Sequence, residues 1–372
     1  MHDDFLHSPF GEIQLLRHPL VSGLKAWDGA DEYLLELAAA HFQQSQSSLI
    51  INDNFGALAC ALHSLQPTSW SDSYTTHLAT QENFTRNQLS ATFTALKSTD
   101  LPTTHCDAVL WRVPKSTSLF EQQIAHLHAL LKPETCILVG GMDKHLLPNT
   151  KALLSRLGHV TTLAGKKKAH VFHVEFDPSL PPPAAPKAIE LILPEHDLII
   201  SGDANVFARE KLDIGARFFI DQFAKLPAAS TIADLGCGNG VLSLVAHKLQ
   251  PLARLHSFDE SYQAIAAART NWQRNNAHDD IESFYVDDGL SHYQGQPFDL
   301  VLCNPPFHQQ HVIGDHLARQ LFAHSKKHLK PGGQLWVVGN RHLNYHTVLE
   351  KQFGNCRQIA ANSKFVVLMA QR

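Results

Sequence analysis

Short apolar runs alternate with helical segments along most of this chain. In the second half the runs cover residues 231–233, 254–258, 283–286 and 298–303, and residues 241–249 have the character of a helix. Short runs rich in Val, Ile and Leu that are separated by helices are typical of a parallel sheet with helices on both faces. We therefore predict an α/β fold.

The first half of the chain repeats the second half in outline. The matching segments are 48–57 with 231–240, 106–115 with 298–307, 131–140 with 329–338, and 151–158 with 348–354. This repeat predicts a duplicated α/β unit, that is, two tandem Rossmann-like domains. A proline-rich stretch that can form neither a helix nor a central strand separates the two copies. We predict domains at residues 1–178 and 194–372, with a linker at 179–193.

The composition is that of a folded, cytoplasmic protein. The 372 residues are 44% hydrophobic and 18% charged, and no apolar stretch is long enough to cross a bilayer. The start of the chain lacks the basic and apolar regions of an export signal. The six cysteines are scattered, without a CxxC pair or a Cys/His cluster at metal spacing. We therefore expect no disulfide frame and no metal, and we expect a monomer.

The charge balance gives little support for a large RNA-binding surface. The net charge is −4, with 31 Lys and Arg against 35 Asp and Glu, whereas nucleic-acid enzymes usually carry a basic footprint. A local basic patch would be sufficient for RNA binding. Candidates are residues 166–168 and the group Lys326, Lys327 and Lys330, although each group taken alone is more typical of a solvated surface.

A glycine-rich loop follows the first apolar run of the second half. Residues 234–240 read Asp-Leu-Gly-Cys-Gly-Asn-Gly, so Gly236, Gly238 and Gly240 form a G-x-G-x-G pattern ahead of a helix. Such a loop is typical of enzymes that bind S-adenosylmethionine, because glycine lets the backbone approach the cofactor. Asp234 would orient this loop and the methionine ammonium group, although an aspartate is also a common turn residue here.

Three further acidic residues follow predicted strands of the second half. Asp259 is placed to accept hydrogen bonds from both ribose hydroxyls of the cofactor, and it would also serve as the cap of the next helix. Asp287 or Asp288 would accept a hydrogen bond from the adenine amino group. Either of these two residues fits a turn equally well, so the sequence does not choose between them.

The segment 205–218 precedes the glycine-rich loop. The spacing of its apolar residues is mainly that of a helix packed on the core. In enzymes of this kind, however, the segment before the first strand commonly closes over the methionine moiety. Phe207, Asp213 and Gly215 are therefore candidate cofactor contacts.

The tetrapeptide Asn-Pro-Pro-Phe at residues 304–307 follows the apolar run 298–303. An exocyclic amine on a purine is a poor nucleophile, because its lone pair is delocalised into the ring. If the side-chain oxygen of Asn304 and the carbonyl of Pro305 each accept one N–H, the amine pyramidalises and its developing charge is stabilised. Phe307 would stack on the base, which is worth roughly 1–3 kcal/mol. The same chemistry serves guanine N2, adenine N6 and glutamine amides.

The first copy of the repeat lacks these chemical groups. Phe55 lies where a glycine would have to let the backbone approach a ligand, and residues 111–115 read Trp-Arg-Val-Pro-Lys in place of the Asn-Pro-Pro-Phe element. We expect that this half binds no cofactor. It would either recognise RNA or support the catalytic half. A binding-only protein with a vestigial pocket is the competing reading of the whole chain, and the intact second copy argues against it.

Four stretches of the second half resemble the ribosomal RNA guanine-N2 methyltransferases with tandem domains. These stretches are residues 234–240, 301–311, 353–356 and 362–368, and residues 26–35 are more similar to the large-subunit members than to the small-subunit members. The resemblance implies two class I methyltransferase domains, the N-terminal one degenerate. It also implies S-adenosylmethionine-dependent N2-methylation of one guanine in 23S rRNA, either naked or in an assembling large subunit. A 16S rRNA target is the alternative.

Overall fold

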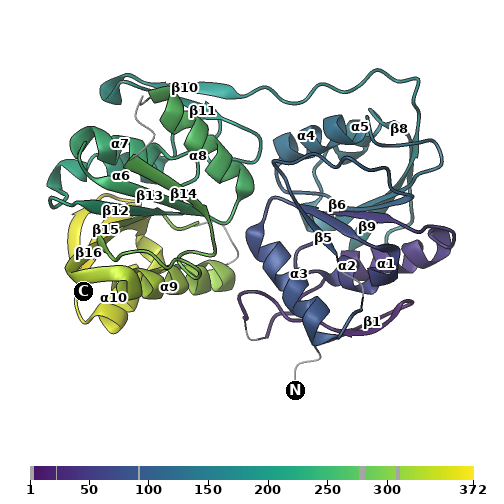
Figure 1. Cartoon of the computed structure of the whole chain (residues 1–372), viewed down its shortest axis with the longest axis horizontal. Helices are drawn as coiled ribbons and strands as arrows, with labels where there is room; N and C mark the ends of the chain where they lie inside the picture. Colours follow the sequence, from purple (N-terminus) through teal and green to yellow (C-terminus); the bar gives the residue numbers. More distant parts are fainter. Residues whose placement is uncertain (1–3, 22, 91–92, 276–280, 307–310) are drawn as a thin grey trace. The chain divides into compact units, whose positions relative to one another are not determined.

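The computed structural model describes residues 4–21, 23–90, 93–275, 281–306 and 311–372. The chain divides into two compact units, Met1–Lys187 and Ala188–Arg372, and each unit contains one seven-stranded sheet (Figure 1). The predicted α/β class with two Rossmann-like domains is confirmed. Within the described residues, no helix combines the length and the apolar character that crossing a bilayer requires.

The first unit has the strand order β5-β4-β3-β6-β7-β9-β8, in which β5 to β7 are parallel and β9 and β8 are antiparallel. A separate hairpin, β1 with β2, precedes the sheet. The elements are β1 (Phe5–Ser8), β2 (Gly11–Gln14), α1 (Gly29–His41), β3 (Ser48–Ile51), α2 (Ala57–Ala61), β4 (Thr68–Ser71), α3 (Tyr74–Arg86), β5 (Thr94–Lys97), β6 (Ala108–Arg112), α4 (Thr117–Leu127), β7 (Cys136–Met142), α5 (Thr150–Leu154), β8 (Gly158–Thr162) and β9 (Ala169–Phe176).

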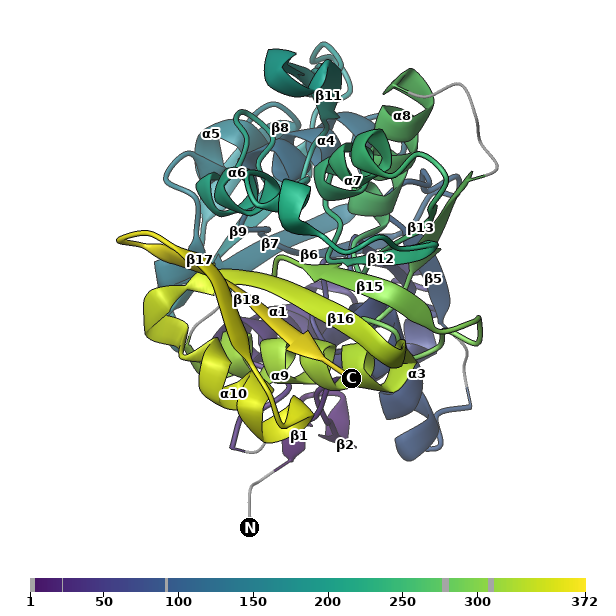
Figure 2. The same cartoon turned by 90° about the vertical axis from the view of Figure 1, so that its left-hand side faces the viewer.

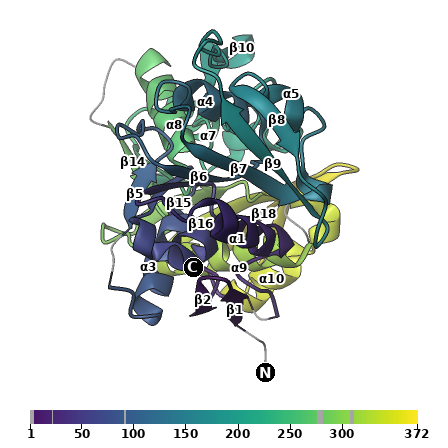
Figure 3. The same ribbon diagram turned by 90° about the vertical axis from the view of Figure 1, so that its right-hand side faces the viewer.

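Successive residues of the central strands in this unit face opposite sides of the sheet, as the pleat requires. Leu110 and Leu138 belong to the apolar cluster beneath α1 and α2, while Val109 and Val139 belong to the cluster beneath α4 and α5. Figure 3 shows α1 on one face of the sheet and α4 and α5 on the other. Both faces are therefore buried, which explains why the strands are continuous apolar runs.

The second unit repeats this architecture with the order β14-β13-β12-β15-β16-β18-β17, and a hairpin, β10 with β11, precedes its sheet. Helices α6 and α7 cover one face of the sheet, and α9 and α10 cover the other (Figure 2). The elements are β10 (Ile189–Leu193), β11 (Leu198–Gly202), α6 (Ile214–Ile220), η4 (Phe223–Lys225), β12 (Thr231–Leu235), α7 (Val241–Leu249), β13 (Arg254–Asp259), α8 (Tyr262–Asn275), β14 (Glu282–Val286), β15 (Phe298–Cys303), α9 (His311–His328), β16 (Leu329–Asn340), α10 (Tyr345–Phe353), β17 (Arg357–Ala361) and β18 (Phe365–Gln371).

One carboxylate anchor occurs in both units. Asp107 Oδ2 accepts hydrogen bonds from the backbone N–H groups of Gln46 and Ser47 and from the Ser47 hydroxyl, at 2.8–3.0 Å. In the second unit Asp299 Oδ2 accepts the same three bonds from Ser230 and Thr231. The first anchor ties the start of β6 to the start of β3, and the second ties the start of β15 to the start of β12. The two halves therefore share hydrogen bonding as well as topology.

The predicted linker, 179–193, ends earlier than expected. Residues 181–188 form no regular secondary structure, but Ile189–Leu193 forms β10 and pairs with β11. The reason is that the last proline of this stretch is Pro186, and the residues beyond it alternate between half-buried and exposed positions as an antiparallel strand does. The division between the two units falls between Lys187 and Ala188.

An ion-pair cluster occupies the end of β6 in the first unit. Arg112 follows Asp107 at the same spacing as Asn304 follows Asp299, so Arg112 occupies the position of Asn304 in the first unit. The Arg112 guanidinium is buried and forms two bonds to Asp28, at 2.8 and 2.9 Å, and a further bond to Asp31. Asp28 is also the N-cap of α1. In the first unit, a salt bridge thus occupies the position at which the second unit has the Asn304 amide.

Only part of the glycine-rich loop is kept in the first unit. Ile50 pairs with Leu110 where Asp234 pairs with Leu302, so Gly56 corresponds to Gly240, and both are helix N-caps with φ angles of +82° and +80°. In this register Phe55 corresponds to Asn239, which corrects the expectation that it replaces a glycine. Phe55 is half-buried, and the Arg17 guanidinium lies 4.4 Å from the centre of its ring. The side chain that was expected to obstruct a ligand is thus part of a packed surface.

Replacement of Arg112 by alanine should destabilise the first unit strongly. Removing one partner of a buried salt bridge leaves uncompensated carboxyl groups and costs about 3–5 kcal/mol. Burial already raises the pKa of Asp31 to about 7 in spite of its contact with Arg112. The free energy of unfolding, measured by urea titration with hydrogen exchange of peptides from the first unit, should fall by that amount.

The matched control is Arg156→Ala, because Arg156 pairs with Glu121 at 3.3 Å on the surface of the same unit. Exposed pairs contribute about 0–1 kcal/mol, so this variant should unfold at nearly the wild-type urea concentration. Equal effects of the two substitutions would contradict the assignment of Arg112 as the ion pair that holds the end of β6.

Candidate active site

The candidate site lies where the strand order of the second unit reverses, between β12 and β15. These two strands are adjacent and parallel, with Leu235 opposite Cys303. The loop after β12 and the segment after β15 therefore leave the sheet side by side, and a Cβ atom built on Gly236 would lie 3.8 Å from the Asn304 carbonyl oxygen. Ligands of open α/β sheets bind at this kind of switch point. Two motifs that are far apart in the sequence thus meet at one edge.

The loop glycines adopt conformations that other residues rarely adopt. Gly236, Gly238 and Gly240 have φ angles of +73°, +55° and +80°. A Cβ atom on Gly238 would meet nothing within 4 Å, whereas one on Gly240 would lie 3.1 Å from Ala268. Gly240 is therefore needed for packing under α8, while Gly236 and Gly238 border open space. This arrangement leaves the loop backbone accessible to a ligand.

Asp259 holds the loop in place from the end of β13. Its Oδ2 accepts a hydrogen bond from the Gly238 N–H at 3.0 Å, and its Oδ1 accepts one from the Ser261 N–H at 2.9 Å. Ser261, and not Asp259, has the cap geometry for α8, because the Ser261 hydroxyl accepts from the Ala264 N–H at 3.0 Å. The predicted carboxylate is thus beside the loop, and the alternative role as helix cap belongs to its neighbour.

The structure distinguishes Asp287 from Asp288. Asp287 is bonded within its own turn: its carboxylate accepts from the N–H of Asp288 at 2.8 Å and from His292 at 2.8 and 3.0 Å. Asp288 Oδ2 accepts from Gln320 Nε2 of α9 at 2.7 Å. Both aspartates are buried, and Asp288 also accepts from the Ser291 hydroxyl within the turn. Asp288 differs from Asp287 in its bond to α9 outside the turn, and we therefore keep Asp288 as the predicted contact of an adenine amino group.

A buried hydrogen-bonded chain connects the glycine-rich loop to β14, and sequence reasoning did not anticipate it. Asp234 Oδ2 accepts from the Ser243 hydroxyl at 3.2 Å, Ser243 Oγ lies 2.8 Å from Ser257 Oγ, and Ser257 Oγ shares a hydrogen bond with Glu282 Oε1. Three links need three protons, and the two hydroxyls supply two. One carboxyl group must therefore be protonated to complete the chain.

The pKa directions of the two acids agree with this proton count. Burial raises the pKa of Asp234 to about 7, against the hydrogen bonds from Ser243, and burial together with Asp234 raises the pKa of Glu282 to about 8 in spite of the Ser257 bond. Glu282 therefore retains its proton at neutral pH, while Asp234 is poised to lose its own. Asp234 Oδ1 is buried and has no hydrogen-bond partner among the described residues.

Asn304 directly follows β15 and is the predicted acceptor group of the site. Its Oδ1 is also buried without a hydrogen-bond partner within the described part of the chain. A buried acceptor without a partner is uncommon and costs roughly 1–3 kcal/mol. Pro305 is buried and Pro306 is exposed. Phe307 lies outside the described residues, so its stacking role stays a prediction.

The segment before β12 differs from its expected packing. Phe207 is 54% exposed and Ile214 is 59% exposed, whereas Leu212 is buried. Helical spacing was misleading because α6 begins only at Ile214, so the residues before it have no common helical face. Asp213 is the N-cap of α6 and accepts from the Ala216 N–H at 2.9 Å, and Gly215 is buried in the first turn. Of the three candidate cofactor contacts, Phe207 is therefore the one with an exposed side chain.

The predicted basic groups are partly neutralised. Lys166 and Lys167 pair with Glu36 and Glu32 of α1, and Lys330 pairs with Asp299 at 2.8 Å. These contacts agree with the structural reading of the lysines, in which each one belongs to the protein surface.

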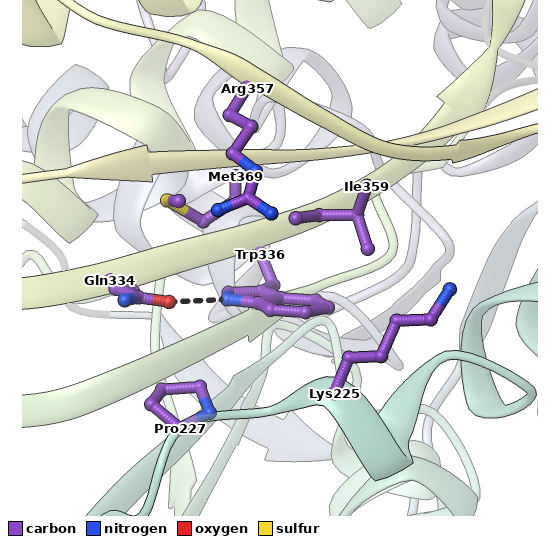
Figure 4. A pocket seen from close by; sticks show the side chains of 7 residues that line it. All are labelled: Lys225, Pro227, Gln334, Trp336, Arg357, Ile359 and Met369. Carbon is purple, nitrogen blue, oxygen red and sulfur yellow. Dashed lines mark hydrogen bonds between the residues drawn. The ribbon is translucent and has the colours of Figure 1, made fainter.

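A separate hollow of about 360 Å³ lies against β16, β17 and β18, lined by Lys225, Pro227, Gln334, Trp336, Arg357, Ile359 and Met369 (Figure 4). Trp336 donates to Gln334 Oε1 at 2.8 Å in its floor. Gln334 lies opposite Leu300, well before the end of β15. This hollow is therefore not part of the site around Asn304.

Two family models match the two halves of the chain separately. Residues 3–178 match the RLMG N-terminal domain, and residues 197–369 match the methyltransferase small domain. A similar solved structure is that of a T. thermophilus protein described as a 16S rRNA N2 methyltransferase (RsmC) in complex with AdoMet and guanosine. The match covers 99% of this chain and 97% of the T. thermophilus chain. Its TM-score is 0.79 at 17% identity, which establishes the shared fold.

Curated relatives are similar over almost the whole length. The ribosomal RNA large subunit methyltransferase G of Yersinia pestis (strain Pestoides F) is 42% identical over 349 residues, which cover 93% of this chain and 88% of the relative. The protein of the same name from Yersinia enterocolitica is 41% identical over 350 residues, with the same coverage. With both halves matched at this level, the chain belongs to the ribosomal RNA large subunit methyltransferase G family.

Proposed function

We propose that this protein transfers a methyl group from S-adenosylmethionine to the exocyclic N2 of one guanine in 23S rRNA. The observation that supports the proposal is the buried Oδ1 of Asn304, which has no hydrogen-bond partner among the described residues and lies beside the glycine-rich loop. Family membership supports the reaction class and the large-subunit RNA. The N2 position is supported by the description of the structural neighbour, which names N2 methylation and guanosine.

The residues around the loop fit S-adenosylmethionine. Gly236 and Gly238 leave room for a ligand against the backbone. The Oδ1 of Asp234, which has no partner in the described part of the chain, is an available acceptor at the end of β12. Asp259 and Asp288 are the acidic groups for the ribose and the adenine amine. Phe207, Asp213 and Gly215 remain proposed contacts of the methionine end. When bound, the cofactor supplies a methyl group activated by its sulfonium.

Asn304 and Pro305 would act on the amine. The Asn304 Oδ1 and the Pro305 carbonyl each accept one N–H, so the nitrogen lone pair leaves conjugation with the ring and its developing positive charge is stabilised. Proline is suited to this role because its fixed φ aims the carbonyl before the substrate arrives. No strong general base is required, because the methylated amine is acidic and loses its proton to water.

The first unit is proposed to hold or support the RNA and not to bind the cofactor. Its Arg112 salt bridge occupies the place of Asn304, and Ile50 occupies the place of Asp234. The proposed division of labour is thus an RNA-supporting domain at residues 1–178 and a catalytic domain at residues 194–372. No metal is required for this chemistry.

Deleting the gene should remove one N2-methylguanosine from 23S rRNA. Mass mapping of nucleosides from both ribosomal subunits of the deletion strain measures this loss, and the intact chain supplied from a plasmid should restore it. Loss from 16S rRNA would instead identify the small-subunit target, and a missing N6-methyladenosine or methylated glutamine would point to the other substrates of the same tetrapeptide.

Asn304→Ala should lower kcat by about 100-fold or more, since removing one group that stabilises the transition state has an effect of this size. S-adenosylmethionine affinity should stay near that of the wild type. Single-turnover methylation and calorimetry measure the two properties. Asn304→Asp keeps an acceptor oxygen and should retain measurable turnover, so full activity in the alanine variant would remove Asn304 from the mechanism.

Gly238→Ala should abolish cofactor binding, because the added Cβ projects into the open space beside the loop. Gly354→Ala is the matched control. Gly354 has a φ of +81° and nothing within 4 Å, so its replacement carries a comparable backbone strain of about 1–3 kcal/mol. Calorimetry should detect normal cofactor binding in this control. Binding by both variants would place the cofactor elsewhere.

Cofactor affinity should increase with pH up to about 7 and then level. Burial raises the pKa of Asp234 to about 7 in the free protein, and a bound ammonium cation favours the ionised form and lowers that pKa. Binding therefore releases a proton below pH 7, and raising the pH favours binding until the group is already ionised. Calorimetry in buffers with different ionisation enthalpies counts this proton, and Asp234→Asn should release none.

A further inference from the structure

Two histidines and a cysteine come together in the first unit, away from the Arg112 cluster. His41 is the last residue of α1, Cys136 is the first residue of β7, and His173 lies in β9. One nitrogen from each histidine and the Cys136 Sγ all lie within 4.8 Å of one another. Three separate elements of the fold thus direct potential metal ligands to one point.

Strand pairing and helix packing produce this arrangement. β7 and β9 are antiparallel neighbours, with Leu138 opposite His173, and Cys136 packs against the apolar cluster under α1. His173 therefore faces the same side of the sheet as Leu138 and Cys136, which is the side that α1 covers. The rings of His41 and His173 stack, with centroids 5.5 Å apart and planes 27° apart.

The accessibility of the cluster suits an ion that binds from solvent. His41 is exposed, whereas Cys136 and His173 are half-buried. Glu175 lies two residues beyond His173 on the same face of β9, where it pairs with His159 of β8. Both of these side chains are exposed. The open side of the cluster is thus flanked by further oxygen and nitrogen donors.

We propose that His41, Cys136 and His173 bind one Zn²⁺ ion. Two imidazole nitrogens and one thiolate are a donor set that zinc prefers, with bonds of about 2.0–2.1 Å to nitrogen and about 2.3 Å to sulfur. Ligand atoms in a tetrahedral site of this kind are roughly 3.5 Å apart. Small rotations of side chains bring the cluster to that spacing. The fourth position faces Glu175 and solvent.

The ion would fasten the C-terminal end of α1 to β7 and β9. Because the ligands are assembled only in the folded unit, the free energy of zinc binding adds to its stability. The site is separate from the methylation chemistry proposed for the second unit. It also changes the expectation from sequence that the protein holds no metal.

Cobalt substitution of the untagged, chelator-treated full-length protein tests the proposal. Addition of Co²⁺ should produce the visible bands of a tetrahedral site and a thiolate-to-cobalt charge-transfer band, saturating at one equivalent and displaced by Zn²⁺. Cys136→Ser should lose the charge-transfer band, and His41→Ala should bind cobalt more weakly. His41 is an exposed residue at a helix end, so its replacement leaves the core intact. Zinc should also raise the Tm of the wild type more than that of His41→Ala.

Cys106→Ser is the matched control, because Cys106 is also a half-buried free thiol of the first unit and should leave the cobalt spectrum unchanged. Two outcomes would overturn the proposal. One is the absence of a tetrahedral cobalt spectrum in the wild type. The other is a spectrum and a zinc-dependent Tm that persist in both Cys136→Ser and His41→Ala, which would place the ion among the other histidines.

Discussion

The pairing of β12 with β15 determines what the second unit, the proposed catalytic half, is able to do. Because parallel strands leave a sheet at the same edge, this pairing places the glycine-rich loop beside Asn304, although the two motifs are far apart in the sequence. Asp259 then fixes the loop through the N–H of Gly238. The cofactor loop and the acceptor group are thus positioned by backbone hydrogen bonds of the sheet, and only their final orientation depends on side chains.

Comparison of the two units separates the residues that make the fold from those that make the chemistry. Both sheets have the same strand order, and both contain the anchoring aspartate. At the strand ends of the first unit, however, Arg112 has both of its carboxylate partners, whereas Asn304 of the second unit has an oxygen with no partner among the residues that the structure describes. A buried polar atom without a partner lowers stability, and the salt bridge removes that cost in the first unit.

The sequence predicted well whatever depends on local pattern. The α/β class and the repeat follow from the apolar runs and from the geometry of parallel strands. Contacts between distant side chains were not predictable in this way. Nothing local to Glu282 indicates a buried acid, and nothing near Arg112 indicates two carboxylates from α1. Phe207 was misread because apolar spacing has the period of a helix whether or not a helix forms, and β10 was assigned to the linker because the prolines before it dominated the pattern.

The anchors at Asp107 and Asp299 make the same bonds in a unit with an intact site and in a unit without one. Selection on catalysis therefore does not explain them, and their role is to set the register between two strands. It follows that this aspartate belongs to the architecture of the unit, and that its presence carries no information on whether that unit is active.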